Sequence, residues 1–288
     1  MMRKYHNMTV QKNLSLAVDI DGTLLNSNRS ISDSTLSYLN NEWPGRIIFV
    51  TGRNEVDAKK VTHRFNPNNR ELYVIFNDGQ DIAEIGKDGE YNPIASFPYI
   101  SDEFIKNFIL WIKEKKTNWV VYHRDEMISI VNDRSLFEFA IVKLLSSKPN
   151  HKFIKGGKNQ YVIDKPVLKI AINGFRKVSI DKLFSDFKCK FGDTVYAVKN
   201  DGMIEIKNNE ATKLEAIKFF LRKYALSESE CIYFGNGGND VDCLKYFTNS
   251  NAVGNAVEDA KKAAKNVTLT NDEDGVIVAL KHYIERKI

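Results

Sequence analysis

Cysteine, proline and long apolar runs are scarce in this chain of 288 residues. The three cysteines, Cys189, Cys231 and Cys243, form no C-x-x-C pair, which excludes a disulfide scaffold and a zinc knuckle. No run approaches the ~18 apolar residues of a membrane span. Residues 1–13 are polar and lack the apolar middle of a signal peptide. We therefore expect a soluble, cytoplasmic protein without a membrane partner.

Repeats, low-complexity segments and a large excess of one charge are also missing. With 6 Pro and 16 Gly, neither a collagen-like nor a disordered chain fits. The 42 Lys and Arg exceed the 37 Asp and Glu by only five, and no basic stripe with interleaved aromatics occurs. We therefore expect no nucleic-acid partner. The length fits one large domain or two ordinary ones.

Both ends of the chain show strands alternating with helices. This alternation is typical of βαβ units around a parallel sheet. The expected strands are 14–21, 46–51, 72–76, 231–234, 251–253 and 267–269, and the expected helices are 32–42, 54–65, 211–224, 240–247, 257–265 and 275–286.

The pattern of expected strands and helices differs in the middle of the chain. Hairpin patterns at 119–131 and 194–207 accompany a strand at 167–172 and helices at 135–145 and 180–187. Hairpins with two helices favour an α+β domain. We therefore predict an α/β fold with a Rossmann-like parallel-sheet core, residues 1–81 and 199–288, interrupted by an inserted α+β domain, residues 82–198.

Polar residues follow four of the expected core strands. They are Asp19 and Asp21, Thr51, Asn77 and Asp78, and Asn236 and Asp240. Ligands of open parallel sheets bind outside the carboxyl ends of the strands, so these side chains are expected to converge on one crevice.

The individual motifs suggest phosphoryl chemistry, although each has a plain structural explanation. Of Asp19 and Asp21, one carboxylate can attack phosphorus while the other donates or accepts a proton. The structural alternative is that the two residues cap a turn. The Thr51-Gly52-Arg53 segment offers a hydroxyl and free N–H groups to an anion, or is a helix cap. Lys213 can neutralise a phosphoryl group, or is a solvated surface lysine.

The segment Phe234-Gly-Asn-Gly-Gly-Asn-Asp240 is rich in glycine and in oxygen donors. Asn236, Asn239 and Asp240 carry oxygens of the kind that Mg²⁺ prefers. A tight loop with helix caps is the alternative.

The order of these motifs resembles the haloacid dehalogenase superfamily. Asp-x-Asp-Gly-Thr, a strand followed by Thr-Gly-Arg, a lone Lys and Gly-Asn-x-x-Asn-Asp stand where that superfamily has its four motifs. The insertion between the second and third motifs resembles the type IIB cap of its Cof-type, sugar-phosphatase-like branch. Segments 253–256 and 271–275 resemble the closing segments of that branch.

The resemblance implies a role for each matched residue. Asp19 would be the nucleophile that forms an aspartyl-phosphate, and Asp21 the general acid/base. Thr51 and Lys213 would hold the phosphoryl oxygens, with Gly52 and Arg53 beside them at the substrate. Mg²⁺ would be bound by Asp19, the Asp21 carbonyl and the loop from Asn236 to Asp240.

One position departs from the family pattern, which usually has Asp where this chain has Asn236. The amide keeps an oxygen ligand but removes one formal charge, so Mg²⁺ binding is expected to be weaker. Asn255 is expected to position substrate. In the cap, Tyr122, His123 and Arg124, and residues 155–158, are candidates for reading the substrate, with a solvated loop as the favoured interpretation. His123 is expected at the surface.

Three functions fit these residues. The first is a Mg²⁺-dependent phosphatase acting on small phosphorylated metabolites, chiefly sugar phosphates. The second is a phosphomutase, in which the phosphoryl group returns to the sugar. The third is a non-catalytic sensor of phosphorylated ligands, for which Asn236 is the one supporting feature.

Overall fold

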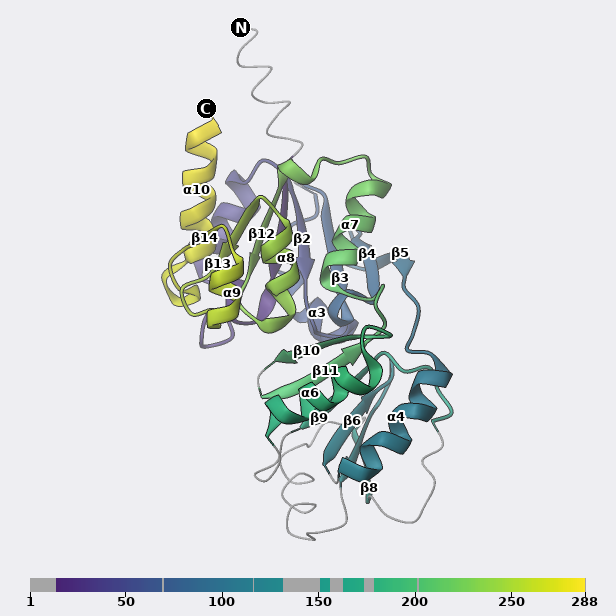
Figure 1. The fold of residues 1–288 in the computed structure, drawn as a ribbon. Coiled ribbons are helices and arrows are strands. Elements are labelled where there is room, and N and C mark those ends of the chain that lie inside the picture. Colours follow the sequence, from purple (N-terminus) through teal and green to yellow (C-terminus); the bar gives the residue numbers. More distant parts are fainter. Residues whose placement is uncertain are drawn as a thin grey trace, which may run out of the picture. The chain divides into compact units, whose positions relative to one another are not determined.

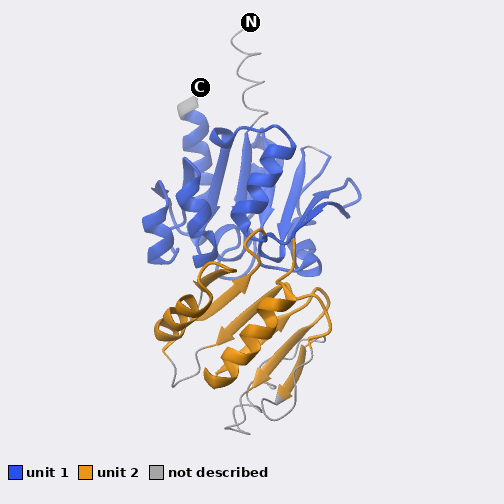
Figure 2. Ribbon diagram, turned by 45° about the vertical axis from the view of Figure 1, so that its right-hand side comes forward, with its two compact units in different colours: residues 1–97, 211–288 blue, residues 98–210 orange. Residues whose placement is uncertain are grey.

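The computed structural model describes residues 14–68, 70–115, 117–131, 151–155, 163–173, 179–200 and 202–287. It divides into two compact units (Figure 2). The first unit comprises residues 1–97 and 211–288, and the second comprises residues 98–210. The division at 97/98 differs from the expected boundary at 81/82 because residues 81–96 add two strands to the first sheet. The division at 210/211 differs from the expected boundary at 198/199 because residues 203–207 form a strand of the second sheet.

The first unit is built on an eight-stranded sheet (Figure 1). Its strand order is β14-β13-β12-β1-β2-β3-β4-β5, and the six strands from β14 to β3 are parallel. The strands are β1 (Ser15–Asp19), β2 (Arg46–Val50), β3 (Leu72–Phe76), β4 (Asp81–Ile85), β5 (Tyr91–Ser96), β12 (Cys231–Gly235), β13 (Asn249–Ala252) and β14 (Asn266–Val267). The prediction of an α/β fold with a parallel-sheet core is confirmed.

Helices and short turns connect these strands. The α-helices are α2 (Asp33–Ser37), α3 (Glu55–Thr62), α7 (Lys213–Lys223), α8 (Val241–Tyr246), α9 (Glu258–Ala263) and α10 (Gly275–Lys287). The short elements are the π-helical turns η1 (Ile20–Leu24) and η2 (Tyr38–Glu42) and the 3-10 turns η3 (Asn77–Gly79), η4 (Glu228–Glu230), η5 (Gly238–Asp240) and η6 (Asn271–Glu273). Within the described ranges, every helix is too short or too polar to cross a bilayer.

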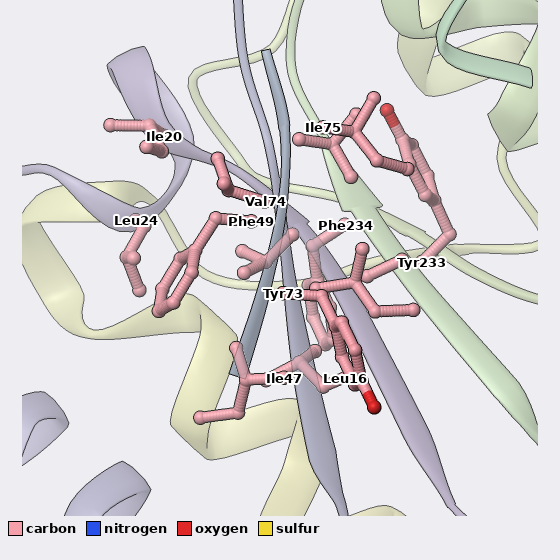
Figure 3. Close-up of a cluster of buried hydrophobic side chains, with 14 of the residues drawn as sticks. Leu16, Ile20, Leu24, Ile47, Phe49, Tyr73, Val74, Ile75, Tyr233 and Phe234 are labelled. Atoms are coloured by element: carbon pink, nitrogen blue, oxygen red, sulfur yellow. The ribbon is translucent and has the colours of Figure 1, made fainter. Parts of the chain in front are cut away.

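The core of the first unit lies on both faces of its central strands. Side chains from β1, β2, β3 and β12, among them Leu16, Phe49, Val74 and Phe234, are fully buried and pack together (Figure 3). Strands covered on both faces are expected to read as continuous apolar runs, as these do. This packing fixes the ends of the four strands at which the polar residues begin.

The second unit has its own sheet and its own core. Its strand order is β10-β11-β9-β6-β7-β8, antiparallel except for the β7–β8 pair. The elements are α4 (Asp102–Lys115), β6 (Asn118–Tyr122), β7 (Met127–Val131), β8 (His151–Lys155), β9 (Lys169–Asn173), α6 (Ile180–Phe191), β10 (Tyr196–Asn200) and β11 (Met203–Lys207). Aromatic residues of α4 and α6, including Phe104, Phe108 and Phe187, pack with Trp119 and Ile172 of the sheet.

Some expectations for the middle of the chain need correction. Strands β4, β5 and β8 and helix α4 were not predicted. His123, expected at the surface, is buried, and its Nδ1 lies 2.9 Å from the carbonyl oxygen of Pro166. The helix expected at 135–145 and most of the segment 155–158 lie outside the described residues.

Candidate active site

Four loops at the carboxyl ends of β1, β2, β3 and β12 bring the polar residues of the first unit together. Asp19 is the last residue of β1, and Thr51 directly follows β2. Lys213 is the first residue of α7, because the Thr212 side chain caps that helix by accepting a hydrogen bond from the Glu215 N–H. The predicted convergence on one edge of the sheet is what the structure shows.

The centre of the site is a buried lysine between two carboxylates. Lys213 Nζ donates to Asp19 Oδ1 and to Asp240 Oδ1, both at 2.7 Å. All three residues are buried. A buried ammonium is costly unless it is paired, and two charge-assisted hydrogen bonds hold this one at a fixed point.

The carboxylate of Asp240 is saturated with donors. Its Oδ1 accepts from Lys213 and from the Tyr233 hydroxyl at 2.6 Å. Its Oδ2 accepts from the backbone N–H groups of Asn236 and Gly237, both at 2.9 Å. A carboxylate offers about four acceptor positions. Asp240 therefore anchors Lys213 and shapes the glycine-rich loop in this structure.

The electrostatics of the pair follow from burial. Burial raises the pKa of Asp19 to about 7, against the lowering effect of Lys213, while Asp240 adds to the rise. Burial alone would lower the pKa of Lys213, but the charges of Asp19, Asp240 and Asp78 outweigh it, and the pKa lies well above its ordinary value. Lys213 is thus charged, and an additional positive charge near Asp19 would favour its ionised form.

The second carboxylate of the Asp-x-Asp pair has a different partner. Arg53 Nε donates to Asp21 Oδ2 at 2.8 Å, and Arg53 Nη2 donates to Asp21 Oδ1 at 2.7 Å. This is a two-pronged pair, and 55% of the Asp21 side chain is exposed. Arg53, assigned to substrate from the sequence, therefore holds Asp21 in this structure.

Thr51, Gly52 and Asp78 form the next part of the site. Thr51 is buried, and its Oγ1 accepts from the Arg53 N–H at 3.1 Å. A Cβ at Gly52 would come within 2.9 Å of Asp78 Oδ1, so the site needs glycine there. Asn239 Nδ2 donates to the same Asp78 oxygen at 2.9 Å. Asn239 thus links the glycine-rich loop to the turn after β3 through its side-chain nitrogen.

Asn236 and Asn255 both contact the loop after β1. Asn236 Oδ1 accepts from the Thr23 hydroxyl at 3.1 Å. Gly22 has φ +73°, and a Cβ there would lie 2.4 Å from Asn236 Nδ2. Asn255 Nδ2 donates to the Gly22 carbonyl at 2.8 Å, and its Oδ1 accepts from the Asn271 N–H at 2.9 Å. Asn255 therefore braces this loop with both ends of its side chain.

Tyr233 and Thr23 are site residues that sequence reasoning missed. Tyr233 is buried in β12 and donates to Asp240, and burial raises the pKa of its phenol well above its ordinary value. A tyrosine three residues before Asn236 in an apolar strand was the available signal. A buried phenol normally needs a polar partner, and the nearest motif supplies it.

The donor set of the site fits a divalent cation of the Mg²⁺ type. Asp19 Oδ2 has no hydrogen-bond partner among the described residues, and Asn236 adds an amide oxygen at the neighbouring loop. Oxygen ligands with only one or two carboxylates are what Mg²⁺ takes in proteins. No cluster of three or more His, Cys, Asp or Glu suited to a metal occurs in the described part of the chain, so waters or substrate oxygens would complete the coordination.

Comparison with known proteins agrees with this geometry. A family model described as haloacid dehalogenase-like hydrolase matches residues 16–280. The chain belongs to this family. The prediction of haloacid dehalogenase membership, made from the four motifs, is confirmed.

Relatives of this haloacid dehalogenase-like hydrolase match it along nearly their whole length. A putative phosphatase of Haemophilus influenzae is 25% identical over 91% of this chain and 95% of its own. Phosphatase YwpJ of Bacillus subtilis is 24% identical, with coverages of 93% and 99%. The solved subclass IIB sugar phosphatase BT4131 superposes with a TM-score of 0.70 at 20% identity, covering 94% of this chain and 98% of its own.

Proposed function

We propose that this hydrolase is a Mg²⁺-dependent phosphatase that cleaves the phosphate monoesters of small metabolites, chiefly sugar phosphates, through an aspartyl-phosphate. The observation that supports this proposal is the state of Asp19, a buried carboxylate. One of its oxygens is held by Lys213, and the other has no hydrogen-bond partner among the described residues. A nucleophile needs a fixed position and a free oxygen. Relatives named phosphatases, which match more than nine-tenths of this chain and of their own length, support the reaction class.

The reaction would run in two balanced steps. An Asp19 oxygen attacks phosphorus, the ester P–O bond breaks, and Asp21 gives a proton to the leaving alcohol. Asp21 then takes a proton from water as that water attacks the aspartyl-phosphate, which releases inorganic phosphate and restores both carboxyl groups. Thr51 and Lys213 would hold the phosphoryl oxygens, since positioning and charge neutralisation are the main needs of phosphoryl transfer.

Asp21 must carry a proton in one step and lose it in the other. Its pair with Arg53 holds both of its oxygens at a fixed place at the mouth of the site. We infer that Arg53 orients Asp21, and that one of the two hydrogen bonds between them breaks when a leaving alcohol binds to Asp21. Arg53 would therefore act on the substrate through Asp21.

The cation would be held by Asp19, the Asp21 backbone carbonyl and Asn236. When bound, it supplies positive charge to the phosphoryl oxygens. Asp240 keeps Lys213 and the loop of Asn236 in place. The second unit would serve as the cap that selects the substrate, consistent with the subclass IIB sugar phosphatase among the structural neighbours.

The first test is phosphate release from p-nitrophenyl phosphate with and without Mg²⁺. We expect Mg²⁺-dependent turnover in the wild type and a loss of at least about 10³-fold in Asp19→Asn, since removal of a nucleophile leaves only binding and electrostatics. Asp88→Asn, a change of the same type at an exposed turn, is the control and is expected to turn over normally. Turnover retained in Asp19→Asn would contradict the aspartyl-phosphate.

A second prediction concerns Asn236. Its amide removes one negative charge from the cation site, so Asn236→Asp is expected to lower the Mg²⁺ concentration at half-maximal rate by about tenfold. Titration of Mg²⁺ at saturating substrate measures it. Asn249→Asp, on a strand away from the site, is the matched control. An unchanged half-saturation would show that Asn236 does not bind the cation.

A further inference from the structure

Tyr233 carries a hydroxyl into the buried strand β12. Its neighbours along the strand, Ile232 and Phe234, are apolar, and all three side chains are buried. Phenylalanine would fill nearly the same volume without a polar atom that needs a partner. The hydroxyl of Tyr233 therefore calls for an explanation beyond packing, and the reaction steps proposed above make no use of it.

The fold holds the Tyr233 ring in place. The parallel registers Ala17↔Tyr233 and Tyr233↔Ser250 set a small, buried residue on either side of it. The Phe247 ring is stacked on it, with the two ring centres 6.0 Å apart. Small neighbours leave room for a large ring, and close packing leaves that ring little freedom to turn. The hydroxyl therefore has a fixed position within the buried cluster of the first unit (Figure 3).

This hydroxyl shares one carboxylate oxygen with Lys213. Tyr233 and Lys213 both donate to Asp240 Oδ1, at 2.6 Å and 2.7 Å. A carboxylate oxygen that accepts a second hydrogen bond holds its own charge more stably and attracts the first donor less strongly. The phenol therefore weakens the attraction of Asp240 for the ammonium group, and it restrains the carboxylate from turning.

Lys213 lies evenly between two carboxylates. An ammonium group has three N–H donors. Two of them go to Asp19 Oδ1 and Asp240 Oδ1, both at 2.7 Å, and the third has no acceptor in the part of the chain that the structure describes. Because two of the hydrogen bonds are fixed, the direction of the third N–H is fixed as well. This third donor is the one that can meet a phosphoryl oxygen in the proposed reaction.

We propose that Tyr233 is a positioning residue for this reaction, which acts through Asp240 to keep Lys213 shared evenly between Asp19 and Asp240. Without the hydroxyl, Asp240 Oδ1 would keep Lys213 as its one donor among the described residues and would draw the ammonium group away from Asp19. A donor that is misplaced by a fraction of an ångström stabilises a transition state less well. This inference rests on the proposed function.

The test measures Mg²⁺-dependent turnover of p-nitrophenyl phosphate by the full-length protein, well below its unfolding temperature. Tyr233→Phe is expected to lower kcat about tenfold and to leave KM within about twofold, because the interaction that is weakened is completed in the transition state. Phe65→Leu, which loosens the same core at a ring that contacts Phe49, is expected to lower stability and keep kcat. Tyr246→Phe removes an exposed hydroxyl and is expected to keep both.

A second measurement shows whether Tyr233 acts through Lys213. Orthovanadate, which mimics the five-coordinate transition state, is titrated calorimetrically with Mg²⁺ into the wild type, Tyr233→Phe, Lys213→Met and the double variant. Tyr233→Phe is expected to raise the Kd several-fold in the wild type and to have no further effect once Lys213 is replaced, since residues that act as a unit are not additive. The kcat comparison stands by itself should Lys213→Met fail to fold.

The outcomes distinguish this inference from the proposed function. If Tyr233→Phe turns over like the wild type, or loses no more kcat than Phe65→Leu, the positioning role is overturned and the phosphatase stands. Equal losses of orthovanadate affinity with and without Lys213 would also overturn the role. A wild type without turnover would overturn the proposed function, and with it the part that Tyr233 has in it.

Discussion

At the scale of single residues, Lys213 organises the site. Its buried ammonium lies near the carboxylates of Asp19, Asp240 and Asp78, and its two hydrogen bonds link the end of β1 to the loop after β12. Tyr233 and two backbone N–H groups complete the shell around Asp240. The position of Lys213 thus depends on a residue that does not touch substrate in the proposed reaction.

Tyr233→Phe removes one of the four donors to Asp240 and keeps the packing of the ring. We expect a loss of about 1–3 kcal/mol in the free energy of unfolding, because a buried charged acceptor loses a hydrogen bond. Urea unfolding measures it. Tyr246→Phe, which loses an exposed bond to Glu228, is the control and should change stability by less than about 0.5 kcal/mol. Equal effects of the two changes would contradict this reading of Asp240.

The sequence located most of this site but not its internal contacts. Asp19 and Asp240 were predicted because polar residues that follow buried strands stand out in a single sequence, and Lys213 because it stands where the resemblance to the superfamily places a lone lysine. Their pairing was not predictable, because hydrogen bonds depend on the side-chain directions of residues up to 194 positions apart. The donor saturation of Asp240 and the Asp21–Arg53 pair are of this kind, and the roles of all these residues stay proposals.

At the scale of elements, Asp274 joins α2 to the turn before α10. It has φ 57°, and its carboxylate accepts from the hydroxyls of Ser32, Ser34 and Thr35, with the Thr35 bond at 2.9 Å. Burial alone would raise the pKa of Asp274, but these three hydroxyls outweigh it and lower the pKa below its ordinary value. Three hydroxyl donors from one helix start therefore stabilise the charged form.

These hydrogen bonds of Asp274 make the free energy of unfolding depend on pH in the acid range. A carboxyl with a lowered folded pKa stabilises the protein above its unfolded pKa of ~4, and this contribution disappears as pH falls through the folded value. Asp274→Asn tolerates the left-handed backbone and removes the charge. We expect it to cost about 1 kcal/mol at pH 7 and progressively less below pH ~4. Urea unfolding at several pH values tests this, and a pH-independent difference would contradict it.

Other elements were predictable to different degrees. The buried strands β1, β2, β3 and β12 were found because apolar runs ended by Gly or Asp are distinctive. Strand β4 was missed because Asp81 and Glu84 interrupt its apolar pattern. Helix α4 was missed although its apolar residues at 104, 105, 108, 111 and 112 follow helical spacing, so that signal was present in the sequence.

At the scale of the whole molecule, the two units have separate hydrophobic cores. Trp43 belongs to the first core, and Trp111 and Trp119 belong to the second. Fluorescence of the tryptophans therefore reports each core separately. Phe108 is fully buried, with its ring centre 5.3 Å from that of Trp119.

Phe108→Ala is expected to destabilise the second unit by about 3–5 kcal/mol, since it opens a cavity in that core. In a Trp43→Phe background, where Trp111 and Trp119 report, the urea concentration at the midpoint of unfolding should fall. In a background with Trp111→Phe and Trp119→Phe, where only Trp43 reports, the midpoint should stay in place. Equal shifts in both backgrounds would show that the two units unfold as one.

The order of strands in the first sheet also governs how the chain matures during synthesis. Strand β1 pairs with β12 in the register Ser15↔Cys231, so one edge of β1 has no permanent neighbour until more than 200 further residues are made. Pairing over such a distance is slow, and an open strand edge invites association with other chains. Lys213 and Asp240 also come late, so a nascent chain carries Asp19 long before its counter-charge exists. Catalytic competence is therefore the last property this molecule acquires.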